Sequence, residues 1–356
     1  MSDTPVKSDV RFIELTQQTE DCGLGHACSF CPGEQSCRLD KAHHDKHLVE
    51  RRLDSIDWVL LVMANKGGVG KSTVSANLSV ALAKQGYRVG LADADIHGPN
   101  APRIFGLHNE RVKVAASGIP TPRFSVSEGG PGVQVGSLGF FLAEADTPVV
   151  WRDAYKHDYI HHMVGSFDWG ELDFLVVDMP PGTGNELITL TDMLEGSNVR
   201  GILVSSADAI ALQDTLKAAR FCKERGVPLL GLVENYAGTI CPHCGGEFEM
   251  FPRAKEIEAF EASEIETLIR VPFAADIANG ASQGAPAASV DGSPIAELFD
   301  QLAAKCRQAV VETSAEEFQQ QLSGVLSHID DLDEADEPLQ EAVKALLEQE
   351  QQRLSK

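Results

Sequence analysis

Residues 66–73 read Lys66-Gly67-Gly68-Val69-Gly70-Lys71-Ser72-Thr73, and this stretch decides the fold. It follows the apolar run Trp58–Ala64 and precedes a helical pattern, so it joins a buried strand to a helix. Glycine lets the backbone curl until successive N–H groups face an anion, and the helix adds the positive end of its dipole. Lys71 can then reach terminal phosphates, and the Ser72 hydroxyl can ligate Mg²⁺. The stretch therefore predicts a phosphate-binding loop that takes a nucleotide.

The loop departs from the strict phosphate-loop pattern at two positions. Asn65 stands where that pattern has a glycine, and Lys66 adds a lysine that the pattern does not require. The alternative interpretation is a glycine-rich turn with incidental lysines. The strand before the loop and the helix after it favour phosphate binding.

The middle of the chain alternates short apolar runs with helical patterns, which predicts an α/β fold with a doubly wound, mostly parallel sheet. Helical patterns at Ser72–Gln85 and Leu212–Glu224 are each followed by a glycine, Gly86 and Gly226, that can end a helix. Such sheets bind ligands beyond the carboxyl ends of their strands. The expected strands are Val59–Ala64, Arg88–Ala92, Val133–Ser137, Phe174–Val177, Gly201–Val204 and Leu229–Val233.

Composition divides the chain into three parts. Residues 1–55 form a cysteine-rich N-terminal arm, residues 56–310 the nucleotide-binding domain, and residues 311–356 an acidic tail. From Glu312 to Lys356 there are twelve acidic and three basic residues. We expect this tail to be a solvated or partly helical arm, the alternative being a docking arm for a basic partner.

The overall charge and hydropathy exclude several classes of partner. A formal net charge of −23 repels nucleic acid and anionic lipid, so neither is expected as a partner. No run approaches the ~18 apolar residues of a membrane span, and Met1–Glu20 lacks the apolar stretch of a signal peptide. We therefore expect a cytoplasmic, reduced protein in which the eight cysteines serve as ligands rather than as disulfides.

Two acidic turns follow expected strands on the edge that carries the phosphate loop. One reads Asp93-Ala94-Asp95-Ile96-His97-Gly98-Pro99-Asn100 and the other Asp178-Met179-Pro180-Pro181-Gly182-Thr183-Gly184. An aspartate there can hold Mg²⁺ through water or orient the attacking water. The alternative is that Asp93 or Asp178 only caps a helix or a turn. All three motifs together predict nucleotide hydrolysis.

The phosphate loop with its extra Lys66, the Asp93–Asn100 turn and the Asp178–Gly184 turn together resemble the Mrp/ApbC-type iron–sulfur cluster carrier ATPases. These belong to the deviant Walker A class, with the nitrogenase iron protein and the cell-division and partition ATPases. The resemblance covers residues 56–310 and implies a homodimer that hydrolyses ATP with Mg²⁺ and delivers clusters to apo iron–sulfur proteins.

The resemblance also implies roles for single residues. Lys66 would reach the partner's nucleotide, and Ser72 would ligate Mg²⁺. Asp95 would orient water, Asp178 would be the Walker B acid, and Asn235 would contact adenine. The phosphate-contacting set is Gly67, Gly68, Val69, Gly70, Lys71, Ser72 and Thr73. The chain departs from the family's pattern at Asn65, at Trp151–Ala154 and at Phe251–Glu266, where a glycine-rich stretch is usual.

Cys241-Pro242-His243-Cys244 follows the last expected strand. Such a pair often forms half of a zinc site, and two thiolates cannot complete a tetrahedral centre. A symmetric dimer would bring two pairs to its two-fold axis, where four thiolates suit one Zn²⁺ or one [4Fe–4S] cluster. The family resemblance implies the transferable cluster, with structural zinc as the alternative.

The arm carries Cys22, Cys28, Cys31 and Cys37 within sixteen residues, and four such cysteines can hold one metal centre within one chain. This resembles the N-terminal [4Fe–4S] arm of the longer family members. In those members the first gap is wider, so Cys22 departs most from the pattern. Alternatives are a four-cysteine zinc site, or one zinc shared between Cys28/Cys31 and Cys241/Cys244.

The other cysteines and histidines give weaker signals. Cys222 and Cys306 lie in apolar helical patterns and are expected to be buried. A group of three histidines is expected to be solvated in a charged linker: His43, His44 and His47. His157 and His161 could share one helix face as a metal pair, although nothing nearby completes such a site.

The sequence therefore predicts an ATP-dependent iron–sulfur carrier or assembly scaffold. One alternative is an electron-transfer ATPase like the nitrogenase iron protein, whose cysteines are widely separated. Another is a zinc-stapled positioning or regulatory ATPase, which would need a basic DNA surface or a basic amphipathic membrane helix. The acidic tail and the two compact cysteine motifs favour the carrier.

Overall fold

The fold was obtained as a computed structural model, which describes residues 22–142, 153–182, 184–241, 243–244, 246–249, 255, 257, 260 and 265–329. Three earlier expectations fall wholly or largely on residues outside these ranges. They concern half of Trp151–Ala154, most of Phe251–Glu266, and the acidic tail beyond residue 329. The side chain of His157 is likewise outside the described set, so its pairing with His161 stays a prediction.

An eight-stranded sheet forms the centre of the molecule, in the order β10-β7-β6-β1-β5-β2-β4-β3. All neighbouring strands are parallel except β3 and β4. The bounds are β1 Ile56–Met63, β2 Val89–Asp93, β3 Arg123–Ser125, β4 Gly132–Ser137, β5 Leu172–Asp178, β6 Val199–Ser206, β7 Leu229–Asn235 and β10 Thr267–Val271. The predicted doubly wound, mostly parallel sheet is confirmed.

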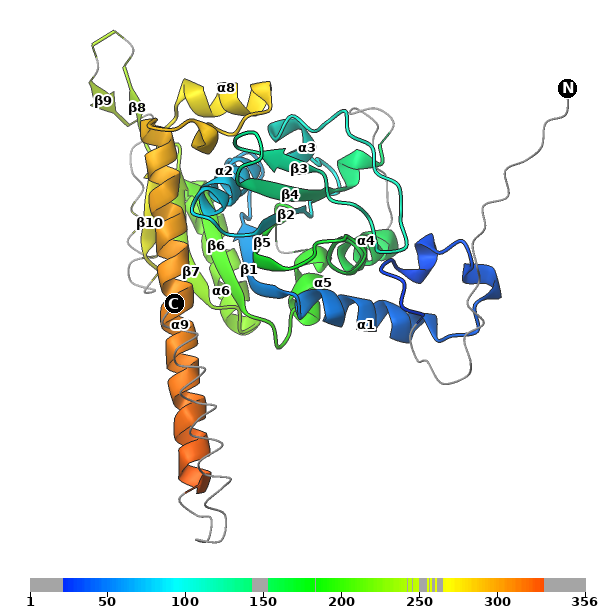
Figure 1. Ribbon diagram of the computed structural model, residues 1–356. Coiled ribbons are helices and arrows are strands. Elements are labelled where there is room, and N and C mark those ends of the chain that lie inside the picture. The colour runs from blue at the N-terminus through cyan, green and yellow to red at the C-terminus, as the bar shows by residue number, and fades with distance from the viewer. Residues whose placement is uncertain are drawn as a thin grey trace, which may run out of the picture.

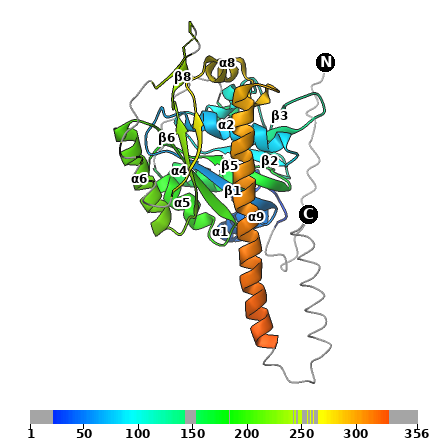
Figure 2. The same cartoon turned by 90° about the vertical axis from the view of Figure 1, so that its left-hand side faces the viewer.

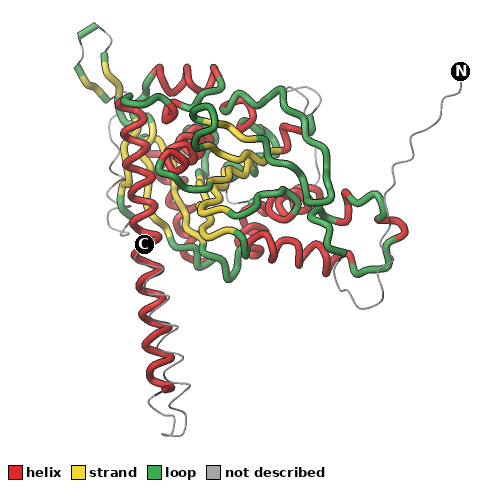
Figure 3. Tube along the Cα trace, viewed as in Figure 1, coloured by secondary structure: helices red, strands yellow, loops and turns green. Residues whose placement is uncertain are grey.

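Helices cover both faces of this sheet, and each face has its own apolar core (Figures 1 and 3). One core joins the sheet to α2 (Lys71–Lys84), α3 (Ala101–Ile104) and α9 (Pro294–Ile329). The other joins it to α1 (Lys41–Leu53), α4 (Asp153–Gly165), α5 (Asn185–Met193) and α6 (Ala209–Glu224). Because both faces are covered, the central strand β1 is an almost continuous apolar run with seven of its eight residues buried.

The six predicted strands are all present, and the two glycine stops are confirmed. Gly86 and Gly226 have φ of 96° and 67°, the left-handed backbone that ends a helix. The sequence missed β10, β3 and the hairpin β8–β9 (Thr239–Ile240 and Glu247–Phe248). Figure 2 shows this hairpin rising above the sheet beside α8 (Ala275–Gln283).

The segment before β1 was expected to be a charged linker, and that expectation was wrong. It is helix α1, whose N-terminus is capped by Asp40 accepting from the N–H groups of Ala42 and His43. Leu48 and Val49 bury its inner side against the domain. His44, expected in solvent, is only 2% exposed. Among the residues described, no helix is both long enough and apolar enough to cross a membrane.

Helix α9 runs past the predicted end of the domain. Its first half buries Phe299, Leu302 and Cys306 in the core, as expected for that cysteine. The backbone then continues as helix to Ile329, away from the sheet (Figure 1).

Candidate nucleotide and metal sites

The phosphate loop lies between the end of β1 and the start of α2, as the sequence predicts. Gly68 and Gly70 have φ of 84° and 86°, which only glycine adopts readily. A Cβ on Gly70 would also lie 2.1 Å from Asn235 Nδ2, so a side chain has no room there. The N-terminus of the 14-residue helix α2 therefore opens directly onto a curled glycine loop, an arrangement that suits an anion.

Lys71 is buried at the base of this loop and holds an ion pair with the end of β5. Its Nζ lies 2.6 Å from Asp178 Oδ1 and also donates to Ser72 Oγ at 3.4 Å. Ser75 Oγ donates to the same Asp178 oxygen at 2.9 Å. The sequence placed Lys71 on the terminal phosphates; in this structure its ammonium lies on the carboxylate instead. Ser75 was missed, although its i+4 spacing from Lys71 could have indicated it.

Asp93 is an acidic neighbour of this pair, because β2 and β5 are adjacent and Asp93 is in register with Asp178. Asp93 is buried, and its Oδ2 accepts from Ala101 N and Ser137 Oγ, each at 3.0 Å. Burial raises the pKa of Asp93 to about 7, and the nearby charge of Asp178 adds to the shift. The capping role considered for Asp93 is thus real, since it holds the N-terminus of α3.

Asp95 lies in the turn after β2 and points differently from Asp93. Its Oδ1 accepts from the N–H groups of His97 and Gly98, both at 3.2 Å. Its carboxylate is less buried than that of Asp93. The structure thus places three aspartates at the strand ends beside the loop, with Asp93 and Asp178 in the interior and Asp95 nearer to solvent.

Asn235, at the end of β7, contacts the loop from outside, and Lys66 lies within the loop itself. Asn235, the last residue of β7, donates from Nδ2 to Val69 O at 2.8 Å. Lys66 Nζ lies 3.8 Å from Asp208 Oδ1, and both side chains are substantially exposed. Asp208 caps α6 and accepts from Ser206 Oγ and Ala211 N, which, with the charge of Lys66, lower its pKa. Of the two lysines in the loop, Lys71 is buried and Lys66 lies at the surface.

The Cys241–Cys244 pair lies at the tip of the β8–β9 hairpin. Cys241 N donates to Gly246 O at 2.9 Å, which closes the turn. Hydrogen bonds from the backbone N–H groups of His243 and Cys244 lower the pKa of the Cys241 thiol, with the Cys244 side chain adding to this effect. Backbone donors aimed at a sulfur favour the thiolate, so the turn fits a metal or cluster ligand. Cys244 is exposed.

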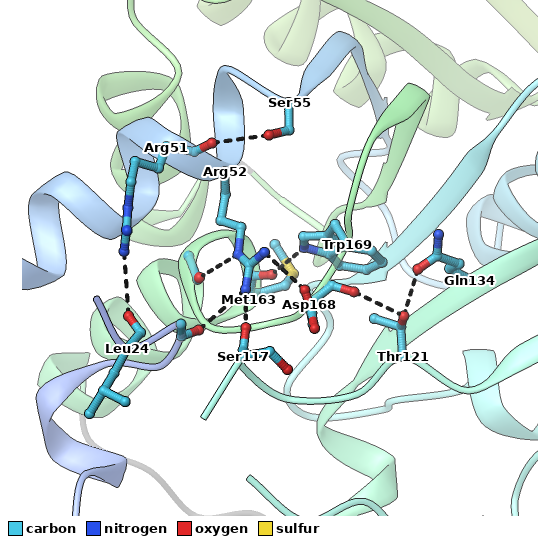
Figure 4. A network of polar contacts seen from close by, with 12 residues as sticks. Leu24, Arg51, Arg52, Ser55, Ser117, Thr121, Gln134, Met163, Asp168 and Trp169 are labelled. Carbon is cyan, nitrogen blue, oxygen red and sulfur yellow. Dashed lines mark hydrogen bonds and ion pairs between the residues drawn. The ribbon is translucent and has the colours of Figure 1, made fainter. Parts of the chain in front are cut away.

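The N-terminal cysteine loop is docked on the domain through Arg52 (Figure 4). The Arg52 guanidinium pairs with Asp168 at 3.0 Å and donates to the carbonyl oxygens of Gly25, Ser117 and Gly165. Beside it, Gly25 N donates to Ala116 O and Ala27 N donates to Ser166 Oγ. The planar, five-donor fork of arginine can join several segments in this way.

Side chains from the loop and from α1 converge on Cys28. Cys22 Sγ lies 3.6 Å from His44 Nδ1, and Cys28 N donates to Asp45 Oδ1 at 2.8 Å. Burial raises the pKa of the Cys28 thiol to about 12, with smaller contributions from Asp45, Cys22 and Cys37. Sequence reasoning missed His44 and Asp45 because α1 was not recognised. The Asp40 cap followed by the apolar Leu48 and Val49 was the available signal.

The two cysteine regions lie far apart in one chain. Figure 1 shows the N-terminal loop at one end of the domain and the β8–β9 hairpin at the other, and the view in Figure 2 agrees. A zinc ion shared within one chain by Cys28/Cys31 and Cys241/Cys244 is therefore excluded. The prediction that Cys222 is a buried apolar residue is confirmed, since it is 1% exposed.

Comparison with known sequences identifies the family. Residues 55–307 match the ParA family described as NUBPL iron-transfer P-loop NTPase. The chain is 36% identical over 263 residues to an iron-sulfur cluster carrier protein of Aquifex aeolicus, covering 73% of this chain and 70% of that protein. It is 39% identical over 222 residues to a cytosolic Fe-S cluster assembly factor NUBP2 homolog of Culex quinquefasciatus, covering 62% and 85%.

Solved structures give the same fold. A nucleotide-binding protein of Archaeoglobus fulgidus, in complex with ADP, superposes with a TM-score of 0.59 at 31% identity, covering 71% of this chain and 96% of that chain. The cell division ATPase MinD of Pyrococcus furiosus superposes with a TM-score of 0.50 at 23% identity, covering 71% and 99%. The second likeness concerns the fold alone.

Proposed function

Since this chain belongs to the NUBPL-type iron-transfer P-loop NTPases, we propose that it is an ATP-dependent iron–sulfur cluster carrier. Two copies would hold one [4Fe–4S] cluster between their Cys241–Cys244 pairs and pass it to apo-proteins in the cytoplasm. The carrier and assembly-factor names of its relatives support this function.

One observation carries the proposal: only five residues, 236–240, separate Asn235, which contacts the phosphate loop, from Cys241 in the thiol turn. Asn235 holds the loop through Val69 O, and Cys241 begins the turn. The connecting backbone is pinned to the end of β10, since Ala237 N donates to Val271 O and Phe273 N donates to Gly238 O. Movement at the nucleotide can therefore reach the thiols through a short, hydrogen-bonded path.

Nucleotide chemistry would use the residues that surround Lys71. Triphosphate oxygens would compete with Asp178 for the Lys71 ammonium, which then has to leave its buried ion pair. The glycine N–H groups and Thr73 would hold phosphates. Ser72 would hold Mg²⁺, which supplies charge neutralisation when bound. Asp178 would serve as the Walker B acid, and Asp95 would orient the attacking water.

Dimerisation would complete two features that are incomplete in one chain. The exposed Lys66 would contact the partner's nucleotide, and the two thiols on each hairpin would become four. The N-terminal cysteines would hold a second [4Fe–4S] cluster in each chain. Two clusters of different attachment, one bridging and one internal, distinguish the carrier from a zinc-stapled ATPase.

Cluster transfer tests this function. The full chain is loaded anaerobically with iron and sulfide and mixed with an apo-enzyme that needs a [4Fe–4S] cluster, with ATP or without nucleotide. We expect the apo-enzyme to gain activity, and the gain to be lost in Cys241→Ala/Cys244→Ala but kept in the buried-cysteine control Cys222→Ala. Equal transfer by all three proteins would contradict the proposal. So would reduction of a partner without any gain of iron, which indicates electron transfer.

A further inference from the structure

Arg270 joins the central sheet to the hairpin β8–β9, which carries Cys241 and Cys244. We propose that Arg270 is a positioning residue for these two thiols: it fastens the hairpin through Glu249 and thereby sets where the thiols lie relative to those of a second chain. The role of the thiols as ligands of a shared cluster rests on the proposed function, whereas the attachment through Arg270 does not.

The first strand of the hairpin is fastened to the sheet close to its backbone. Phe273 N donates to Gly238 O at 2.7 Å, and Thr239 Oγ1 donates to Phe273 O at 2.8 Å. The second strand, β9, pairs with β8 in a separate two-stranded sheet. An isolated hairpin is marginally stable in water, so its order depends on what fastens it to the rest of the domain. A further contact at the second strand would hold both sides of the hairpin.

Arg270 supplies that contact from β10. Its Nη2 lies 3.1 Å from the Oε1 of Glu249, the residue that directly follows β9. The same nitrogen donates to Ala237 O at 3.4 Å, just before β8 begins. The guanidinium thus connects the two ends of the hairpin, which the fixed fork of arginine donors permits.

Glu234 holds this guanidinium from inside the sheet. It is the register partner of Arg270 on β7, and its Oε1 lies 3.2 Å from Nε and 3.1 Å from Nη2. The Glu234 side chain is fully buried, whereas those of Arg270 and Glu249 are 44% and 47% exposed. The inner pair is the fixed end, because opening it would remove the cation from a buried carboxylate. The outer pair with Glu249 can open at little cost.

The fixed end lies beside the phosphate loop. Glu234 directly precedes Asn235, whose Nδ2 donates to Val69 O in that loop. Arg270 thus ties the hairpin to the same strand end that contacts the loop, in addition to the backbone connection through residues 236–240. A hairpin held at both ends presents its thiols in one orientation, and two such hairpins can meet with little further ordering.

Amide hydrogen exchange of the full, metal-free chain tests the contact. Glu249→Lys puts a cation against the guanidinium, and we expect exchange across residues 239–249 to be about threefold faster than in the wild type, the effect of one exposed ion pair. Glu249→Gln should fall between the two. Raising the salt concentration should bring the wild type towards Glu249→Gln, since screening removes the attraction between the charges. Equal exchange in all three proteins would overturn the proposal.

Glu266→Lys is the matched control. Glu266 forms an exposed ion pair with Lys305 at 2.9 Å, at the opposite end of β10 from the hairpin, so this variant should leave the hairpin unchanged. Arg270→Lys keeps a cation beside Glu234 but cannot span both carboxylates, so it should match Glu249→Gln. In Arg270→Lys/Glu249→Gln the two effects should not add, as expected for residues that act through one contact. Additive effects, or the same change in Glu266→Lys, would overturn the assignment.

Cluster release tests the positioning role. Wild type and Glu249→Lys are loaded anaerobically with iron and sulfide, and an iron chelator is added. Both should bind ATP equally. We expect about two irons per chain, the share of a bridging cluster, to leave about threefold faster from the variant, while about four N-terminal irons leave at the wild-type rate. Equal release would overturn the positioning role. A wild type without iron at the hairpin would instead contradict the proposed function, and the exchange measurement would still decide the contact of Arg270.

Discussion

The N-terminal cysteine loop and the β8–β9 hairpin both present thiols, but they are built in opposite ways. In the loop, thiols converge with a buried histidine, and Arg52 fastens the whole segment to the domain. On the hairpin, two cysteines occupy an exposed tip, and the part of the chain that the structure describes brings no other thiol to them. This difference agrees with the proposal that the loop binds a metal centre within one chain and that the hairpin supplies half of a site shared by two chains.

The two lysines of the phosphate loop differ in the same way. Lys71 is buried and neutralised by Asp178, while Lys66 forms only a 3.8 Å exposed pair with Asp208. The lysine proposed to act within its own chain is thus buried and held by a short ion pair. Groups proposed to act across a dimer lie at the surface with weak partners, which suggests that exposure marks the functions that need a second copy.

Lys71→Ala should have the largest effect, because it opens the most enclosed site. It leaves Asp178 without its cation, beside a second buried carboxyl group at Asp93. Removing one partner of a buried ion pair typically costs about 3–5 kcal/mol. We expect loss of ATP binding together with a fall of that order in the free energy of unfolding, measured by denaturant titration.

Lys71→Ala/Asp178→Asn is the control for this prediction. It removes the stranded charge, so most of the stability should return while ATP binding stays lost. A single variant as stable as the wild type would show that the pair is not enclosed in solution.

Arg52→Ala should have the next largest effect on stability. The N-terminal loop would lose its attachment to the domain through Arg52, which distinguishes it from the hairpin. The substitution removes an ion pair and several hydrogen bonds that fasten the N-terminal loop, which are worth about 1–3 kcal/mol. We expect faster amide exchange across residues 22–53 and reduced iron retention there, with the hairpin unchanged. Arg52→Lys should behave similarly, because an ammonium cannot span the same acceptors. Unchanged exchange in both variants would argue against docking through Arg52.

Asp93→Asn tests the raised pKa of the buried Asp93 through the pH dependence of stability. The pKa of Asp93 is raised from 3.8 to about 7, so the folded state binds its proton more tightly than the unfolded state does. Its contribution is greatest below pH 4 and is lost as the pH rises toward 7. The nucleotide-free variant should therefore gain stability relative to the wild type between pH 4 and 7, by about 1 kcal/mol or more. Parallel thermal unfolding curves across this range would contradict the raised pKa.

Lys66→Ala should have the smallest effect on stability, within about 0.5 kcal/mol, because exposed ion pairs contribute little. If Lys66 acts on the partner's nucleotide, the variant should still bind ATP but should lose most of its hydrolysis. Mixing it with a Lys71→Ala chain separates action across the dimer from action within one chain. Partial recovery of hydrolysis is expected only if each chain supplies a different lysine to the shared site.

The sequence predicted the sheet well, because buried parallel strands are continuous apolar runs such as Leu60–Met63. It missed β10, which is short, carries Arg270 and follows a charged stretch. Arg270 forms an ion pair there with the buried Glu234. This pairing joins two strands that are distant in sequence, so no local pattern reveals it. The edge strand β3 has only three residues, too few for periodicity to show.

The phosphate loop and the acidic turns beside it were predictable in position because glycine spacing and acidic turns are local signals. The contact of Asn235 with Val69 O was not predicted, and its proposed contact with adenine stays a prediction. The contact between His44 and Cys22 was not predictable by the same means. It depends on how α1 packs against a loop that lies 22 positions earlier in the chain. Cys222 and Cys306 were identified correctly as core residues because they lie in apolar helical patterns.

Metal counting together with molecular mass shows whether the hairpin is half of a cluster site that two chains share. Protein purified without oxygen is analysed for iron, acid-labile sulfide, zinc and oligomeric state, beside Cys241→Ala/Cys244→Ala. We expect a dimer with about six irons per chain, falling to about four irons in a monomeric variant. Stoichiometric zinc without sulfide, or six irons in a wild-type monomer, would contradict it.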